Sequence, residues 1–232
     1  MPEIKTQQFS AASEAAIKDP KLRRALDRVA SGFEVARLDR IEEVTPEVWD
    51  VWKQQARDIK VHTLEHLDYY LDLLYTNVTA AGGHLHFAKD ADQANEIVAH
   101  IARTRNVKVA TKSKSMVSEE LALNPVLESL GVEVWETDLG EYIIQLAEET
   151  PSHLVAPALH KSKEDVAELF TEKLGIPYDD DIFHMAATAR TVLRDKFMEA
   201  DLGISGANFV VAETGTLVIF TNEGNGRLCT SA

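Results

Sequence analysis

The chain has 232 residues, 45% of them hydrophobic and 27% charged, and its 24 Lys and Arg against 38 Asp and Glu give a net charge of −14. This composition excludes intrinsic disorder, and the negative charge argues against general nucleic-acid binding, which needs basic side chains to replace phosphate counterions. The single cysteine, Cys229, excludes a disulfide framework, a four-thiolate zinc site and an iron–sulfur cluster held by this chain alone.

Neither a membrane span nor a secretory signal is visible in the sequence. No run of about 18 uncharged apolar residues occurs, and the N-terminus lacks a basic segment followed by an apolar one. We therefore expect a cytoplasmic protein with no transmembrane segment.

The first third of the chain has the periodicity of helices. Asp19-Pro20 provides an N-cap and a proline at the first helical position, and Thr45-Pro46 repeats this signal. Apolar residues then recur at helical spacing as far as Leu74, which predicts one amphipathic helix of about thirty residues. We expect residues 1–80 to form a helical N-terminal arm.

After Gly82 short apolar runs alternate with helical segments. Four runs predict strands: His84–Ala88, Val107–Thr111, Val132–Glu136 and His153–Pro157. Strand–helix–strand units favour parallel pairing, so we expect residues 81–232 to form an α/β domain with a mostly parallel central sheet flanked by helices.

The last part of the chain predicts a helix followed by a hairpin. Asp180–Ala200 carries an apolar stripe, and the strands Ala207–Glu213 and Thr216–Thr221 meet at Thr214-Gly215. Beyond them we predict a glycine-rich loop with no closing helix or strand, which suggests a truncated chain.

Open α/β sheets bind ligands at the carboxyl ends of their strands, so the loops after strands carry most weight. Lys112, Ser113, Lys114 and Ser115 follow one strand and precede a helix, which favours an anion site. The alternative is a solvated loop in which Ser118 caps the helix.

Three carboxylates follow the next strand. Glu136, Asp138 and Glu141 would suit a substrate cation, a metal or a proton. Asp138 and Glu141 also have the spacing of a capping box, a purely structural alternative, so Glu136 is the freer candidate.

The C-terminal motifs offer a second set of polar groups. Glu213, Thr214 and Gly215 place a carboxylate at the hairpin. Further candidate residues follow the second strand: Asn222, Glu223, Gly224, Asn225 and Arg227. Glycine backbone N–H groups and a guanidinium can bind carboxylate or phosphate, while an Asn-Gly turn with a surface arginine is the alternative.

Histidines give a weaker metal signal. His62 and His66 match the H-x-x-E-H zinc pattern, and His84 and His86 lie two residues apart on a predicted strand. Because His62 and His66 flank an apolar stripe that packing already explains, half-buried histidines bonded to backbone or carboxylate are the favoured alternative.

Several of these motifs together resemble one known family, that of lactate-utilisation protein B. The resemblance rests on Lys112–Glu120, Glu136–Leu146, Pro157–Lys161, Ala212–Thr216 and Asn222–Thr230. That family is the iron–sulfur subunit of a bacterial three-protein system that oxidises L-lactate to pyruvate. The resemblance implies a LUD domain, with a fold similar to the sugar-phosphate isomerase and CoA-transferase group.

The resemblance also implies a ferredoxin-like region with two [4Fe–4S] clusters, whose cysteine motifs this chain lacks. We therefore expect these residues to bind a small anion such as lactate or pyruvate and to dock sister subunits. The implied ligand-binding residues are Lys112, Ser113, Ser115, Glu136, Asp138, Glu141, Thr214, Gly215, Asn222, Gly224, Asn225 and Arg227. No catalytic role carries over to any of them.

Two alternatives remain open. In one, the domain is a stand-alone acyl-transferase or isomerase in which Glu213 or Glu223 is the nucleophile or general base. In the other, it is a pure interaction module, whose signature would be an exposed apolar patch around the C-terminal loop.

Overall fold

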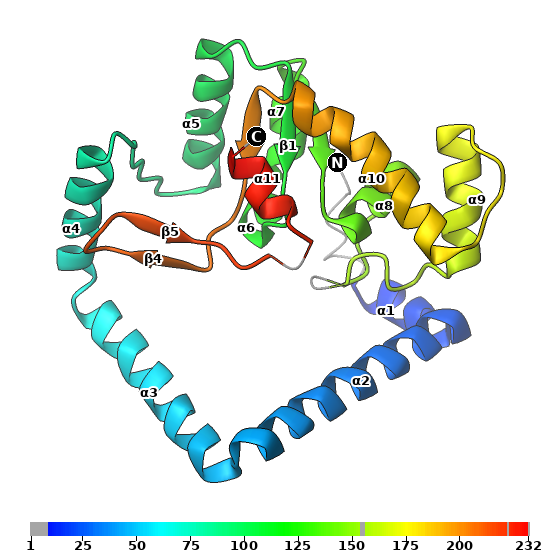
Figure 1. The fold of residues 1–232 in the computed structure, drawn as a ribbon, viewed down its shortest axis with the longest axis horizontal. Helices are drawn as coiled ribbons and strands as arrows, with labels where there is room; N and C mark the ends of the chain where they lie inside the picture. The colour runs from blue at the N-terminus through cyan, green and yellow to red at the C-terminus, as the bar shows by residue number, and fades with distance from the viewer. Residues whose placement is uncertain (1–8, 154–155, 222, 232) are drawn as a thin grey trace. The chain divides into compact units, whose positions relative to one another are not determined.

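The computed structural model describes residues 9–153, 156–221 and 223–231. Within them the chain divides into two compact units: residues 86–209 with 217–231, and residues 9–85 with 210–216 (Figure 1). The expected boundary between residues 80 and 81 stays a prediction.

The second unit begins with four helices, α1 (Phe9–Lys18), α2 (Pro20–Val44), α3 (Pro46–Glu65) and α4 (Leu67–Ala80). The Asp19 carboxylate accepts the backbone N–H groups of Lys21 and Leu22 at 2.8 and 3.1 Å, which confirms the predicted start of α2. The prediction of a single helix of about thirty residues was wrong. His66, with φ of −123°, leaves helical geometry and separates α3 from α4.

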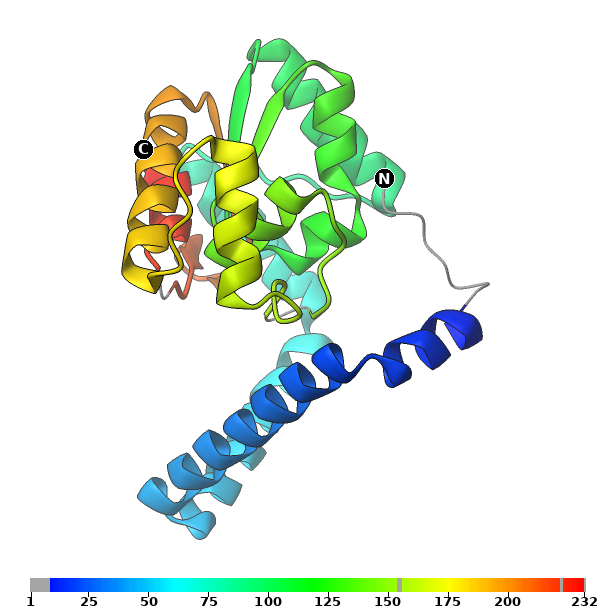
Figure 2. The same ribbon diagram turned by 90° about the vertical axis from the view of Figure 1, so that its right-hand side faces the viewer.

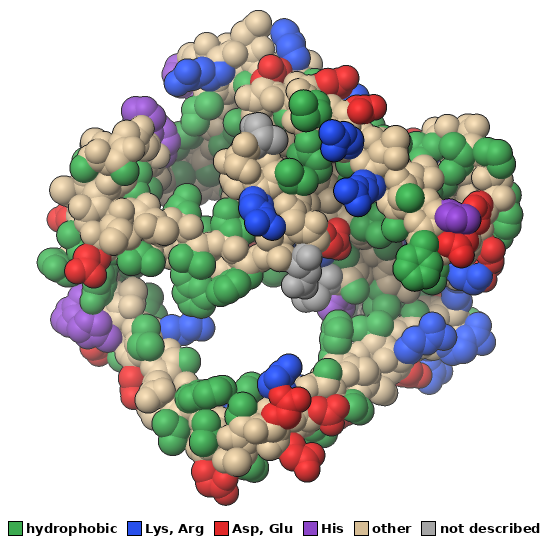
Figure 3. Space-filling view, in the orientation of Figure 1, with side chains coloured by type: hydrophobic (Ala, Val, Ile, Leu, Met, Phe, Trp, Pro, Cys, Tyr) green, Lys and Arg blue, Asp and Glu red, His purple; other side chains and the backbone are tan. Residues whose placement is uncertain are grey.

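None of these four helices has a buried residue. Large apolar side chains such as Phe33, Val51 and Ile59 are more than half exposed, and hydrophobic and charged side chains lie side by side on α2 and α3 (Figure 3). These helices therefore lack the buried apolar face that stabilises most helices in globular proteins.

The first unit contains the sheet. Its helices are α5 (Ala91–Thr104), α6 (Met116–Glu120), α7 (Leu123–Ser129), α8 (Leu139–Ala147), α9 (Lys163–Leu174), α10 (Ile182–Glu199) and α11 (Asn225–Ser231). Strands β1 (Val109–Lys112), β2 (Glu133–Glu136) and β3 (Leu202–Ile204) form a parallel sheet in the order β2-β1-β3. The α/β prediction is thereby confirmed, as are the predicted strands at β1 and β2 and the helix at α10.

Helices cover both faces of this sheet (Figure 2). On one face Ala110 and Val134 pack with α5 and α7 around the fully buried Leu127. On the other, Trp135 packs against a cluster that α8, α9 and α10 build around Tyr142 and Phe170. Val134 and Trp135 are neighbours in β2, so the alternation of a strand sends them to opposite cores.

The predicted hairpin is present as a separate two-stranded sheet of β4 (Phe209–Val211) and β5 (Thr216–Val218). Gly215 has φ of +69°, as a tight turn requires, and its α-carbon lies against the backbone of Asn77. The Asn77 amide donates to the carbonyls of Ala212 and Glu213 at 2.9 and 3.0 Å, which attaches the turn to α4.

One other strand prediction was wrong, and a second falls partly outside the described residues. Residues 84–88 form no strand, so His84 and His86 do not share a strand face. These residues pair with none of the strands in the described part of the chain. In the range 153–157, residues 154 and 155 lie outside the described residues, and the others form no strand.

The predicted absence of a closing element was also wrong, because residues 225–231 form α11. This helix packs on β3 at Gly203, where a Cβ atom would lie 1.5 Å from the carbonyl oxygen of Cys229. Only glycine permits this approach. Among the helices in the described ranges, none combines the length and apolarity needed to cross a membrane.

Candidate functional site

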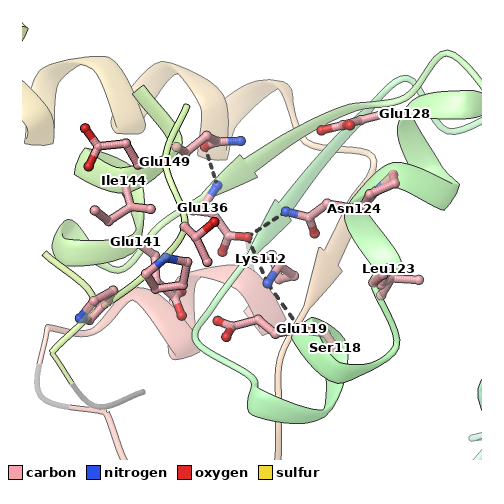
Figure 4. A pocket seen from close by; sticks show the side chains of 16 residues that line it. Lys112, Ser118, Glu119, Leu123, Asn124, Glu128, Glu136, Glu141, Ile144 and Glu149 are labelled. Atoms are coloured by element: carbon pink, nitrogen blue, oxygen red, sulfur yellow. Dashed lines mark hydrogen bonds and ion pairs between the residues drawn. The ribbon is translucent and has the colours of Figure 1, made fainter. Parts of the chain in front are cut away.

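A pocket of about 370 Å³ opens at the carboxyl ends of β1 and β2 (Figure 4). Side chains from both strands, from α6, α7 and α8, and from residues 149–151 and 157 line it. This is where a parallel sheet is expected to bind a ligand.

A buried ion pair forms the floor of the pocket. Lys112 and Glu136 end neighbouring strands, are partners in the sheet register, and lie 2.8 Å apart from Nζ to Oε1. Their side chains are only 1% and 9% exposed. Lys112 also donates to Ser118 Oγ at 3.1 Å, and Asn124 donates to Glu136 Oε1 at 2.7 Å. These bonds offset the cost of burying both charges.

Gln145 fixes the position of Glu136. Its side-chain carbonyl accepts the Glu136 backbone N–H at 3.0 Å, and its amide donates to the Val134 carbonyl at 2.7 Å. Helix α8 is thus bonded to the end of β2. The second carboxylate oxygen of Glu136, Oε2, is buried and has no hydrogen-bond partner among the described residues.

Glu141 lies beside this pair and is 5% exposed. Neither oxygen of its carboxyl group has a hydrogen-bond partner of good geometry in the described part of the chain. Burial raises the pKa of Glu141 to about 9; a side-chain interaction with the carboxyl group of Glu119 and the charges of Glu136 and Asp138 add to this, while the charge of Lys112 opposes it. At neutral pH Glu141 is therefore a neutral acid that can donate a hydrogen bond.

The floor of the pocket consequently offers three polar groups to a ligand. An ammonium has three N–H donors, and two of those on Lys112 have partners among the described residues. The O–H of Glu141 is a second donor, and Oε2 of Glu136 is an acceptor. Leu123 and Ile144 supply apolar wall, so the arrangement suits a small ligand with a carboxylate, a hydroxyl and a short alkyl group.

Asp138 lies outside the pocket lining. Its carboxylate accepts the Glu141 backbone N–H at 3.2 Å and so caps α8, and it lies 3.2 Å from Lys114 Nζ. This confirms that Asp138 caps the helix, as the structural alternative predicted. Glu223 accepts the Leu139 N–H at 3.3 Å, and burial and then Asp138 raise its pKa.

The two serines predicted at the end of β1 have structural bonds. Ser113 donates to Ser205 Oγ at 2.8 Å. Ser115 caps α6 by accepting the Ser118 N–H at 3.3 Å, so the prediction of Ser118 as the cap was wrong. The cap lies three residues earlier because the chain leaves extended geometry at Ser115.

The hairpin residues belong to the other unit. Glu213 and Thr214 are exposed, and Thr214 Oγ1 donates to Thr216 Oγ1 at 2.8 Å. Gly215 takes the positive φ of the turn.

The C-terminal motif is only partly described. Asn222 lies outside the described residues. Gly224 has φ of +80°, and Asn225 Oδ1 accepts from Thr221 Oγ1 at 2.9 Å. Arg227 is an exposed residue of α11, and neither it nor Gly224 or Asn225 lines the pocket.

The histidine motif lies within the helical arm. His62 Nε2 is 3.0 Å from the Tyr70 hydroxyl, and the rings of His62 and His66 are 4.6 Å apart. Among the described residues no group of three or more His, Cys, Asp or Glu could hold a metal ion.

Sequence reasoning missed Asn124 and Gln145, which fix Glu136. Gln145 lies four residues after Glu141, so both project from the same face of α8, and this spacing was a usable signal. Asn124 had no such signal, since its role depends on how α7 packs.

Comparison with known proteins identifies the family. The LUD domain family matches residues 71–232. The chain belongs to the LUD domain family. It is 43% identical over 215 residues to "Lactate utilization protein B" of Bacillus thuringiensis (strain Al Hakam), Bacillus cereus (strain AH187) and Bacillus anthracis (strain A0248). These matches cover 93% of the chain and 45% of each relative, so the chain spans less than half the length of these relatives.

No solved structure matches this LUD chain, so the fold similarity to the sugar-phosphate isomerase and CoA-transferase group stays a prediction. The [4Fe–4S] clusters that the resemblance implies do not fit the residues present. Cys229 is the single cysteine, it is buried beside Thr137, and burial raises the pKa of its thiol. A cluster needs several accessible thiolates.

Proposed function

We propose that this LUD domain serves lactate utilisation and that its pocket binds L-lactate. The names of the relatives support the first part, because three Bacillus proteins 43% identical to this chain are called lactate utilization protein B. The floor of the pocket supports the second part. Any clusters of the whole protein would need thiolates from outside these residues, and docking of sister subunits stays a prediction.

The observation that carries the proposal is the set of buried polar groups of Lys112, Glu136 and Glu141 at the floor of the pocket. A lactate carboxylate would accept from the free N–H of Lys112 and from the protonated Glu141. The lactate hydroxyl would donate to Oε2 of Glu136. The ligand would thus form three hydrogen bonds with buried polar groups of the pocket.

This arrangement also gives selectivity for the hydroxy acid. Pyruvate has a keto oxygen where lactate has a hydroxyl, so it would present an acceptor to the Glu136 carboxylate. Two acceptors facing each other in a buried site cost free energy, since neither is paired. We expect L-lactate to bind more tightly than pyruvate by about tenfold.

Calorimetric titration at pH 7 tests this proposal with L-lactate, pyruvate and L-lactamide. We expect lactate to bind best and the neutral amide to bind worst, because it lacks the carboxylate. Glu128→Gln is a matched control, since Glu128 lies at the exposed rim of the pocket and should leave affinity unchanged. The absence of heat with all three ligands, in a sample with native circular dichroism, would refute the pocket assignment.

Two alternatives to the lactate pocket were an enzyme that uses Glu213 or Glu223 and a pure interaction module. Glu213 and Glu223 lie outside the pocket, so an acyl-transferase or isomerase that uses them stays a prediction. The hypothesis of an interaction module predicts exposed apolar side chains near the C-terminal loop. Phe209, Phe220 and Leu228 are exposed there.

A further inference from the structure

A serine, a histidine and a glutamate form a hydrogen-bonded chain, of which only the glutamate lines the pocket. His160 Nε2 lies 2.7 Å from Oε2 of Glu149, and His160 Nδ1 lies 2.9 Å from Oγ of Ser152. Ser152 is exposed, while Glu149 lines the pocket together with Pro151 and Pro157. Of the three residues only Glu149 lines the pocket, and none of them belongs to its floor.

The order of the bonds fits an activated hydroxyl. A neutral imidazole that donates its Nε2–H to Glu149 presents the Nδ1 lone pair to the Ser152 O–H. Glu149 is an ionised acceptor: burial opposes its ionisation, but hydrogen bonds from Lys161 and His160 outweigh burial and lower its pKa. A fixed carboxylate would thus hold the tautomer that accepts the serine proton.

The Ser152 hydroxyl has a second possible acceptor, and a bond to it would give Ser152 a purely structural role. The Ser152 hydroxyl is also 3.2 Å from the Pro157 carbonyl, to which it can donate. However, the Ser152 backbone N–H already donates to that carbonyl at 3.1 Å. The loop is therefore closed by the backbone, and the hydroxyl can turn to His160 without leaving Pro157 unpaired.

We propose that Ser152 is a nucleophile that His160 activates, and that this site hydrolyses short-chain carboxylic esters. Ser152 Oγ bonds to the ester carbonyl carbon as its proton moves to His160 Nδ1. The bond from carbon to the leaving oxygen then breaks, and the alcohol leaves with that proton. Water reverses these steps, giving its proton to His160 and hydroxide to the acyl carbon, and so releases the acid and regenerates Ser152.

The test uses p-nitrophenyl acetate and a serine-reactive fluorophosphonate on the full chain. We expect p-nitrophenol release at least tenfold above that of Ser152→Ala, and probe label on the peptide that contains Ser152. His160→Gln should abolish both signals, because glutamine keeps a polar side chain but accepts no proton. Ser129→Ala is a matched control, since Ser129 is an exposed serine that donates to its own helix.

Each variant is first shown to keep the circular dichroism of the parent chain, since loss of the loop structure would also remove activity. Equal release from the parent chain and from folded Ser152→Ala, or label on any residue other than Ser152, would overturn the proposal. Neither result would bear on the proposed lactate site, because calorimetric titration tests that site separately.

Discussion

The helical arm and the sheet unit use the same residue types with opposite consequences. In the arm, Lys53 and Asp50 form an ion pair whose side chains are 63% and 70% exposed. In the sheet unit, Lys112 and Glu136 form a pair of the same length that is almost fully buried. Water screens the first pair and leaves the second to act in a low-dielectric environment.

Burial therefore decides which charges carry chemistry. The four helices of the arm have no buried residue. Beside the buried pair, Glu141 has a pKa of about 9. Breaking each feature in turn tests how strongly burial separates the two regions.

The largest effect is expected for Glu136→Gln. This change leaves the Lys112 ammonium buried without its counter-charge, which costs about 3–5 kcal/mol of unfolding free energy. Urea denaturation followed by tryptophan fluorescence measures the loss. A loss below about 1 kcal/mol would show that water or another group already solvates Lys112.

The next effect concerns Glu141 and pH. Because its folded pKa lies above the unfolded value of 4.5, the group stabilises the fold fully below pH 4.5, and this contribution falls as pH rises toward 9. The slope reaches at most about 1.4 kcal/mol per pH unit. Glu141→Gln should remove this slope from denaturation curves measured between pH 5 and 9.

Glu128→Gln, the rim control, should keep the slope of the parent chain. An identical slope in the parent and in Glu141→Gln would contradict a protonated Glu141.

A smaller effect is expected at the start of α2. Asp19→Ala removes the carboxylate that accepts two backbone N–H groups, which costs about 1 kcal/mol of helix stability. Hydrogen exchange should become faster in residues 20–25 and stay unchanged in the sheet. Faster exchange throughout the chain would mean that the arm and the sheet unfold together.

The smallest effect is expected for Asp50→Asn. The exposed pair with Lys53 contributes less than about 0.5 kcal/mol, so urea denaturation should hardly change. A loss approaching that of Glu136→Gln would remove the contrast between the two regions.

Local patterns predicted the parts of this structure that local chemistry determines. Asp19-Pro20 predicted the start of α2, and the strand-end rule placed Lys112 and Glu136 at the site. Local patterns failed where tertiary packing determines the structure. The alternation of residues 84–88 resembles a strand, but these residues join neither of the two sheets in the described part of the chain.

The site itself was only partly predictable for the same reason. Spacing alone cannot show that Glu141 is buried beside Lys112 while Asp138, three residues earlier, caps a helix outside the pocket. The bond between His160 and Glu149 joins residues eleven apart across an irregular segment, where no periodicity exists to indicate it.

The pH dependence of L-lactate affinity tests the central claim most directly, since a protonated Glu141 is the donor that admits a second carboxylate. Titrations from pH 6 to 10 should show constant affinity up to about pH 8 and then a decline that approaches about tenfold per pH unit above 9. In Glu141→Gln, lactate should still bind, with no such decline. Equal affinity across this range in the parent chain would contradict the account.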